Sequence, residues 1–129
     1  MKGKRQTPEA DFQRKLVALL TYRVRRELIW MHSANGDLRN VLVAKRLKEM
    51  GVLPGVPDMC FLLDRGRTGW LELKAPGGRL TPEQRGFGMK SQKLGHYWGM
   101  ASTMDEAMTI LKAWGALYPD GDDDGGMAA

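Results

Sequence analysis

The sequence contains a single cysteine, Cys60, so no disulfide can form within the chain. Small secreted domains commonly depend on disulfides, and their absence favours a reducing, intracellular setting. Cys60 lies within the apolar segment Met59–Leu63, where a cysteine is more often a core residue than a reactive nucleophile. We therefore expect a cytoplasmic protein.

Long apolar runs are also absent. The sequence has no stretch of about 18 apolar residues, the length that a membrane-spanning helix needs. The N-terminal residues 1–6 are mostly basic and polar and lack the apolar stretch of a secretory signal. These absences lead us to expect no membrane segment and no export.

Negative charge is scarce outside the C-terminus. The chain has 20 Lys and Arg against 15 Asp and Glu, a net charge of +5. Four of the acids crowd the C-terminal segment: Asp120, Asp122, Asp123 and Asp124. The rest of the chain is strongly basic, which favours a polyanionic partner because each Lys or Arg near a phosphate releases condensed counterions. A basic surface that serves only solubility is equally compatible with the charge alone.

Length and composition fit one globular domain. The 129 residues are 43% apolar and 27% charged, values typical of a folded protein with one core. We expect a single domain over residues 1–118 and a disordered acidic tail over residues 119–129. The tail resembles the start of a calcium-binding loop, but it ends before the glutamate that such a loop requires. We interpret it as acidic composition only.

Helix signals mark both ends of the chain. Thr7-Pro8 is a typical helix start. An apolar stripe at four-residue spacing follows, made of Phe12, Leu16, Leu20, Val24 and Leu28. Residues 28–31 either end this helix or begin a short strand. Near the C-terminus, Thr103 and Glu106 form a possible capping box before a helix whose apolar face runs to Trp114.

Between these helices the sequence alternates helix and strand signals. We first expect a turn at Asn35-Gly36 and a helix over Asn40–Met50 capped by Gly51. A strand over Asp58–Leu63, a hairpin loop over Asp64–Gly69 and a strand over Trp70–Lys74 follow. The last elements before the C-terminal helix are a helix from Thr81 and a strand over His96–Ala101. Thr81 and Gln84 are spaced for a reciprocal capping box. Helices interleaved with short strands predict an α/β domain, a small mixed sheet flanked by helices.

Three charged side chains stand out in the expected strands. Side chains alternate along a strand, so Glu72 and Lys74 project from the face opposite to their apolar neighbours, and Asp58 opens the preceding strand. Two carboxylates at one strand end are the hard oxygen ligands that Mg²⁺ or Mn²⁺ prefers. A nearby ammonium can orient water and stabilise charge on a phosphorus centre.

A simpler interpretation exists for Glu72 and Lys74. A Glu-x-Lys sequence is common by chance and also occurs on exposed strands with alternating charges. Here the flanking apolar residues make both strands core elements, where a charged residue needs a reason, and the Gly and Pro residues before Asp58 fix its backbone. His32 and His96 have no metal-ligand spacing, and we expect them to be structural or surface residues.

Asp58, Glu72 and Lys74 belong to a series of short motifs that follow one another along the chain. The motifs are Glu9 with Gln13, Gly55–Asp58, Trp70–Pro76 and Gly78–Gln84. Together the motifs resemble the VRR-NUC (virus-type replication-repair nuclease) family of the PD-(D/E)XK nuclease superfamily, from about Glu9 to Trp114. The resemblance implies a restriction-endonuclease-like PD-(D/E)XK core. It also implies a Mg²⁺- or Mn²⁺-dependent endonuclease that hydrolyses DNA phosphodiester bonds.

The resemblance implies a metal site and a catalytic lysine. Asp58 and Glu72 would bind the metal together with the backbone carbonyl of Leu73, and Glu9 would complete the site directly or through water. Lys74 would be the catalytic lysine.

Glu9 and Gln84, which the resemblance places at the site, have simpler roles as well. Glu9 at a helix start suits the positive end of the helix dipole. Gln84, which the resemblance points into the site, already has the capping role.

The resemblance also suggests a partner and an assembly. The chain is short and matches stand-alone members of the family, which are homodimers that resolve four-way (Holliday) junctions in replication, repair and recombination. We therefore expect a homodimer acting on branched DNA, associated with the nucleoid if the protein is bacterial or from a phage. The cations expected to contact DNA are Arg14, Lys15, Arg25, Arg26, Lys45 and Arg79.

Two other functions stay open. A non-catalytic DNA-binding module would use the basic charge but would have no use for Asp58, Glu72 and Lys74 together. A metal-dependent hydrolase of a small phosphorylated substrate would not need so basic a body.

Overall fold

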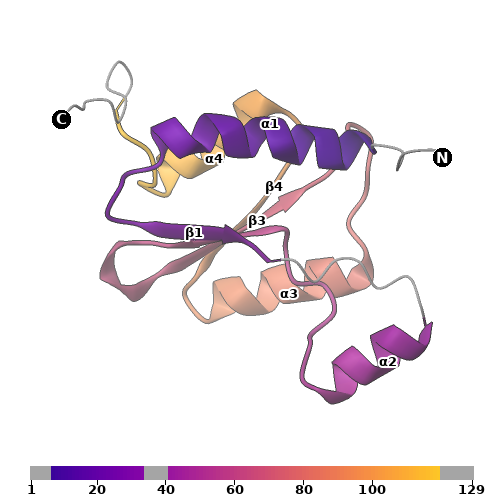
Figure 1. Ribbon diagram of the computed structural model, residues 1–129. Helices are drawn as coiled ribbons and strands as arrows, with labels where there is room; N and C mark the ends of the chain where they lie inside the picture. The colour runs from indigo at the N-terminus through magenta and orange to yellow at the C-terminus, as the bar shows by residue number, and fades with distance from the viewer. Residues whose placement is uncertain (1–6, 34–40, 120–129) are drawn as a thin grey trace.

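The computed structural model describes residues 7–33 and 41–119 (Figure 1). Its helices are α1 (Pro8–Arg23), α2 (Val41–Glu49), α3 (Pro82–Lys93) and α4 (Met104–Ala113). Its strands are β1 (Ile29–His32), β2 (Met59–Leu62), β3 (Thr68–Leu73) and β4 (Tyr97–Ala101). A 3₁₀ turn over Asp64–Gly66 joins β2 to β3. The elements follow one another in the order that the sequence predicts.

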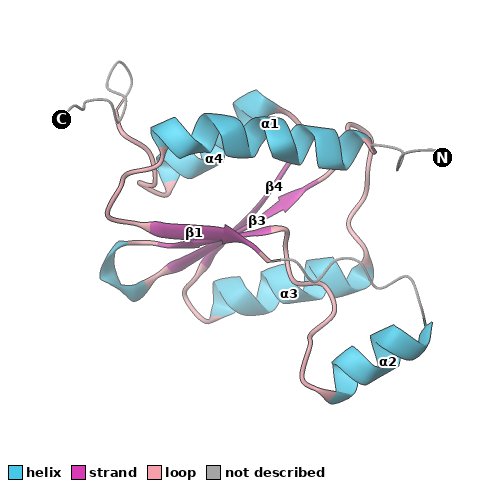
Figure 2. Ribbon diagram, viewed as in Figure 1, coloured by secondary structure: helices cyan, strands magenta, loops and turns pink. Residues whose placement is uncertain are grey.

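These strands form one mixed sheet in the order β1-β2-β3-β4. Figure 2 shows the strands in magenta and the helices in cyan. β1 pairs with β2 and β2 with β3 in antiparallel fashion, whereas β3 and β4 are parallel. Parallel neighbours need a crossover connection, and α3 supplies it. The mixed sheet confirms the predicted α/β class, and the open alternative at residues 28–31 is decided in favour of a strand.

Helices cover the sheet on both faces. Figure 1 shows α1 and α4 along one face and α3 along the other. The main core lies between the sheet and the α1/α4 layer. Its fully buried side chains include Leu16, Leu20, Phe61, Leu71 and Leu111. Burial of a side chain of this size stabilises the fold by roughly 1.5–3 kcal/mol, so this layer supplies most of the apolar stabilisation.

The α3 layer is smaller and more aromatic. Phe87 of α3 meets Trp70 of β3 edge to face, with ring centroids 5.0 Å apart. Gly88 lies so close to Trp98 of β4 that a Cβ at position 88 would be 2.7 Å from the indole ring. α3 therefore lies directly over β3 and β4. Other apolar side chains of the sheet are exposed to solvent, namely Ile29, Met31, Leu62 and Met100.

The first helix is shorter than its apolar stripe suggests. α1 ends at Arg23, and Val24 is extended, with φ −76° and ψ 136°. Val24 pairs with Leu117 in an isolated β-bridge, which draws the chain out of the helix. Leu28 packs against the core from the turn before β1. The last two residues of the stripe are thus core residues outside the helix, which corrects the expected helix face.

The helix starts follow their sequence signals, with one shift at α4. Thr7 and Thr81 cap α1 and α3 as predicted. At α4, Oγ1 of Thr103 accepts a hydrogen bond from the N–H of Glu106 at 3.1 Å, as a capping box requires. The Glu106 carboxylate, however, accepts from the N–H of Ser102 at 2.7 Å rather than from that of the cap residue. The glutamate therefore satisfies a backbone donor one residue earlier than a reciprocal box would.

Some predictions concern segments at the edge of the described chain. α2 ends as expected, with Gly51 at a φ of 98° just beyond it. The turn at Asn35-Gly36, the start of α2 at Asn40 and the acidic tail beyond Pro119 lie outside the described residues. Within residues 7–33 and 41–119, no helix is long and apolar enough to cross a membrane.

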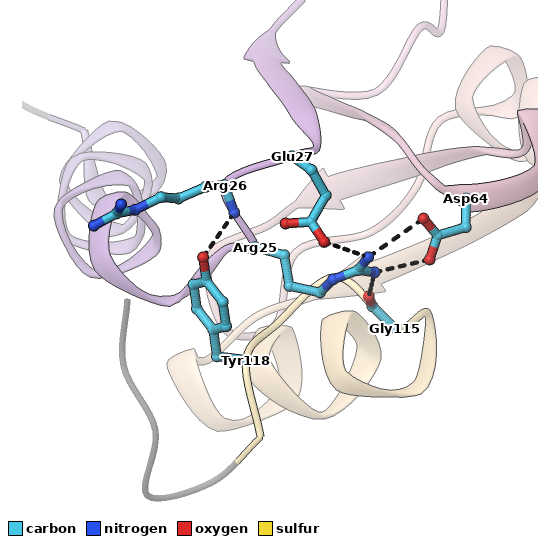
Figure 3. Close-up of polar contacts among 6 residues, drawn as sticks. All are labelled: Arg25, Arg26, Glu27, Asp64, Gly115 and Tyr118. Carbon is cyan, nitrogen blue, oxygen red and sulfur yellow. Dashed lines mark hydrogen bonds and ion pairs between the residues drawn. The ribbon is translucent and has the colours of Figure 1, made fainter. Parts of the chain in front are cut away.

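Arg25 joins the end of α1 to two segments that are distant in sequence (Figure 3). Its Nη1 donates to the carbonyl of Gly115 and to Oδ2 of Asp64, both at 2.8 Å. Its Nη2 donates to Oε2 of Glu27 at 2.9 Å. Asp64 lies in the turn between β2 and β3, and Gly115 follows α4. A single guanidinium therefore connects the first helix, the hairpin and the last helix.

We predict that Arg25→Met lowers the melting temperature at pH 7 by several degrees, because two carboxylates and a carbonyl lose a shared donor. The hydrogen bonds from Arg25 hold the pKa of Asp64 below its ordinary value. Such a carboxylate stabilises the fold above its unfolded-state pKa of about 4, and this contribution is lost as the pH falls through the lowered folded-state pKa. The difference between wild type and variant should therefore be full at neutral pH and shrink in acid.

Thermal melts of both proteins between neutral and acidic pH measure this difference. Arg14→Met is the control, since Arg14 is an exposed arginine of α1. A difference that stays constant down to the acid limit would contradict the structural role of Arg25.

Candidate active site

Asp58 and Glu72 face each other across the β2–β3 pair. Met59 pairs with Leu71, so the antiparallel register places Asp58, one residue before β2, opposite Glu72. The two neighbours of Glu72 in β3 belong to the α1/α4 core. By strand alternation, Glu72 and Lys74 then project from the α3 face. This is the arrangement that the sequence predicts for the three charged residues.

Short polar contacts hold these side chains together. Oδ2 of Asp58 accepts a hydrogen bond from the backbone N–H of Leu73 at 2.8 Å. Nε2 of Gln84 donates to Oε2 of Glu72 at 3.1 Å, and Nζ of Lys74 lies 3.8 Å from the same oxygen. Glu72 and Lys74 are 3% and 9% exposed. The structure thus brings Asp58, Glu72, Lys74 and Gln84 into one cluster, in which Glu72 and Lys74 are buried and the other two are half-buried.

The electrostatics of this cluster favour a cation. Burial raises the pKa of Glu72 to about 8, and the negative charge of Asp58 adds to the rise, while Lys74 opposes it. When both carboxylates are ionised, they carry one more charge than the Lys74 ammonium neutralises, and a bound cation would favour that ionised form. Carboxylate oxygens are also the ligands that Mg²⁺ and Mn²⁺ prefer. The residues present therefore fit a divalent metal ion.

Glu9 is less closely engaged than the sequence resemblance implies. It lies in the first turn of α1 with an exposed side chain, and its charge makes only a small contribution to the raised pKa of Glu72. In the part of the chain that the structure describes, no three His, Cys, Asp or Glu side chains are grouped closely enough to hold a metal ion. The carboxylate centre is therefore the pair Asp58 and Glu72. Metal ligation by Glu9 and by the Leu73 carbonyl stays a prediction.

Gln84 has both of the roles that the sequence left open. Its Oε1 accepts a hydrogen bond from the N–H of Thr81 at 2.9 Å, which completes the capping box of α3. Its Nε2 donates to Glu72. One side chain therefore fixes the start of α3 and orients the buried carboxylate at the same time.

Gly55 brings the loop before Asp58 into contact with α3. Its φ is 85°, and a Cβ at this position would be 2.4 Å from the carbonyl oxygen of Glu83 and 2.9 Å from the backbone nitrogen of Gln84. No residue with a side chain fits this approach without a shift of the helix. The contact couples the backbone that presents Asp58 to the helix that presents Gln84.

His32 lies at the site, although no sequence signal indicates it. Its Nδ1 is 2.8 Å from the backbone carbonyl oxygen of Asp58 and 2.9 Å from Nε2 of Gln13. The N–H of Ser33 donates to the same carbonyl at 2.7 Å. These contacts fix the backbone of Asp58 from the side of β1. The expected structural role of His32 is thus correct, but its position depends on the pairing of β1 with β2, which spacing does not reveal.

The cations predicted to contact DNA are spread over several elements. Most of them are exposed: Arg14, Lys15, Arg26, Lys45 and Arg79. Arg25 differs, because its guanidinium forms the structural contacts described above and its side chain is 23% exposed. Contact with DNA stays a prediction for all six.

The fold is similar to that of a solved structure described as a VRR_NUC domain protein. The TM-score is 0.69 and the sequence identity 19%, and the match covers 85% of this chain and 89% of that chain. No protein-family model and no curated protein matches the sequence. The structural match confirms the fold that the sequence motifs imply, a small mixed sheet with flanking helices.

We predict that Gly55→Ala destabilises the protein more than Gly51→Ala does. Both glycines have positive φ, 85° and 98°, and nothing lies within 4 Å of a Cβ at Gly51. Positive φ costs an alanine about 1–2 kcal/mol in either position. Only Gly55→Ala also displaces the first turn of α3, which we expect to add about 1–3 kcal/mol. Denaturant unfolding of the two variants measures the difference, and equal losses of stability would show that the close approach at Gly55 is not maintained in solution.

Proposed function

We propose that this chain is a divalent-metal-dependent endodeoxyribonuclease that hydrolyses DNA phosphodiester bonds. The observation that carries the proposal is the convergence of Asp58, Glu72, Lys74 and Gln84 at one end of the β2–β3 pair. The convergence occurs in a fold similar to that of a VRR_NUC domain protein, at the positions that match the family motifs.

A non-catalytic DNA-binding module explains this cluster less well. Buried carboxylates and a buried lysine reduce stability relative to apolar residues of similar size. A surface that binds DNA only through its cations does not need them. Such groups are typical of catalytic sites, where desolvation and charge partners shift their protonation equilibria.

The proposed metal site uses the carboxylate pair. Asp58 and Glu72, with the carbonyl of Leu73 and with Glu9 directly or through water, would hold Mg²⁺ or Mn²⁺. When bound, the ion supplies Lewis acidity and lowers the pKa of a coordinated water. The hydrogen bond from the N–H of Leu73 keeps Asp58 in place, and the one from Gln84 orients Glu72.

Lys74 supplies positive charge where the phosphate would react. Its Nζ lies on the same side of the sheet as the carboxylates, 3.8 Å from Oε2 of Glu72, and the residue is 9% exposed. Charge interactions are stronger there than in bulk water. We assign to Lys74 the orientation of the attacking water and the stabilisation of negative charge that develops on the phosphate oxygens.

DNA is the proposed substrate because the chain is basic and its exposed cations are spread over several elements. Phosphate contacts from Lys and Arg give affinity without reading sequence. Lys74 directly follows β3, and Arg79 lies in the segment between β3 and α3. Arg14 and Lys15 lie on the helix that carries Glu9. These residues are suited to contact phosphates on either side of the reacting one.

We predict that Asp58→Asn, Glu72→Gln and Lys74→Met each reduce cleavage of DNA by about 100-fold or more, because each removes a metal ligand or a charge needed in the transition state. DNA binding should change little, since the phosphate contacts are distributed. Cleavage should require Mg²⁺ or Mn²⁺ and stop in EDTA.

The measurement is cleavage of labelled DNA, paired with binding by fluorescence anisotropy. Glu49→Gln and Lys93→Met make the same chemical changes at exposed helical positions and should cleave normally. A Lys74→Met protein that cuts at the wild-type rate would rule out the proposed mechanism.

Exposed apolar side chains support a homodimer. Trp30 stacks on Phe61, with ring centroids 6.1 Å apart, on the core side of the sheet. The alternating neighbours therefore lie on the other face: Ile29, Met31 and Leu62, which are 59%, 43% and 40% exposed. Figure 1 shows α2 set apart from the sheet, and its Leu42 is 74% exposed. We infer that a second copy of the chain covers this surface and that the paired sites act on branched DNA, as the family resemblance implies.

We predict a dimeric mass at micromolar concentration and a preference for four-way over linear DNA. The preference should persist at raised salt, because shape recognition is screened less than phosphate contacts are. Met31→Lys should yield a monomer, whereas Thr109→Lys, an exposed position on α4, should not. Sedimentation and competition binding at two salt concentrations measure both properties. A monomeric wild type, or equal affinity for the two DNAs at the higher salt, would exclude this assembly but not the nuclease.

A further inference from the structure

A pocket lies on the α3 face of the sheet, next to the candidate active site. Its volume is about 540 Å³, and it is bounded by α3, by β3 and by the loop before β2. Trp70, Phe87, Leu94 and Leu53 form much of its wall. This volume is in the range of sites that bind small molecules, which are typically apolar with a few polar groups. None of the roles described so far uses this pocket.

Residues that line the pocket lie next to the site residues along both α3 and β3. Gln84 of α3 contacts Glu72 of β3. Phe87, almost one turn further along α3, contacts Trp70, two residues earlier in β3. Two residues of a strand span about 7 Å, and neighbouring nucleotides of a stacked strand are about 3.4 Å apart. If one phosphate of a DNA strand lies at Glu72, the base that reaches the pocket would therefore be about two nucleotides away along that strand.

The polar groups of the pocket suit a nucleotide. The backbone N–H of Thr68 donates to Nδ1 of His96 at 3.1 Å. The neutral imidazole must then carry its proton on Nε2, so His96 offers a hydrogen-bond donor at the wall of the pocket. Lys90 adds a positive charge and Glu83 a negative one at the end nearer the carboxylates. Aromatic walls, a fixed donor and a cation match a flat heteroaromatic ring with an attached phosphate.

We propose that this pocket binds one unstacked nucleobase of the DNA strand that is cut at Asp58 and Glu72. The inference rests on the proposed nuclease function and deepens it. A base held against Trp70 and Phe87 would fix which phosphate reaches the carboxylates. Bases that are already unpaired cost least to unstack, so the pocket would favour DNA with unpaired nucleotides near the cut. A base that stacks on an aromatic side chain typically contributes a factor of about 10 or more to affinity.

The test is a scan of branched DNA in which one nucleotide at a time, around the cut, is replaced by an abasic residue. Cleavage efficiency with Mn²⁺ and affinity by anisotropy are measured for each substrate. We expect one position at which the abasic residue lowers both by about 10-fold, while its neighbours have little effect.

Two variants of α3 and its cap provide the matched comparison. Leu94 lines the pocket and is 77% exposed, and Met89 is 66% exposed and does not line it. Because both side chains are exposed, we expect each position to accept a charge without loss of the fold, and thermal melts of the two variants check this. Leu94→Glu should weaken cleavage of intact DNA by about 10-fold and remove the positional effect, because a carboxylate at the pocket repels the strand. Met89→Glu should leave the scan unchanged.

The other outcomes separate this proposal from the one it rests on. If the wild type cuts every abasic substrate equally well, or if Leu94→Glu keeps the positional effect, the pocket does not bind a base and the nuclease assignment stands. If Leu94→Glu converts a dimer to a monomer with an unchanged scan, the pocket holds an apolar segment of a second copy instead. If the wild type cuts no DNA, both proposals fail.

Discussion

The antiparallel pairing of β2 with β3 is the interaction on which the candidate site depends. Its register sets Asp58 opposite Glu72, and a slip of one residue would turn Glu72 into the apolar core and Leu71 toward α3. Burial of Met59 and Leu71 on the core side opposes such a slip. On the other side, the carboxylate of Asp58 accepts a hydrogen bond from the N–H of Leu73. The contacts between the two strands therefore extend to the residue before β2. The same carboxylate is thus part of the sheet and part of the site.

Local signals in the sequence predict the order of the elements and the central residues of the site, but not where the first helix ends. Alternation along β3 predicts that Glu72 and Lys74 share a face, and the spacing of Thr81 and Gln84 predicts the start of α3; both are correct. Features that depend on segments far apart in the sequence were not predictable. The bridge that ends α1 early, the contact of His32 with Asp58 and the approach of Gly55 to α3 have no periodicity or motif of their own. They follow from tertiary packing, which overrides local preference.

The two faces of β3 have different physical demands. The side chains that face α1 and α4 are apolar and fully buried, and they stabilise the fold through removal of surface from water. The side chains that face α3 include a carboxylate and an ammonium, whose desolvation reduces stability. Alternate residues of one strand point to the two faces. A substitution that weakens the core and a substitution that alters the site can therefore lie at adjacent positions in the sequence.

The double role of Gln84 has a consequence for the dynamics of the molecule. Helix ends open transiently at a small free-energy cost compared with global unfolding. When the first turn of α3 opens, Gln84 loses its hydrogen bonds to Thr81 and to Glu72 at the same time, because one side chain makes both. The fraction of molecules with a fully ordered site is then set by the opening equilibrium of one helical turn, and hydrogen exchange at the backbone amide of Gln84 would report that fraction directly.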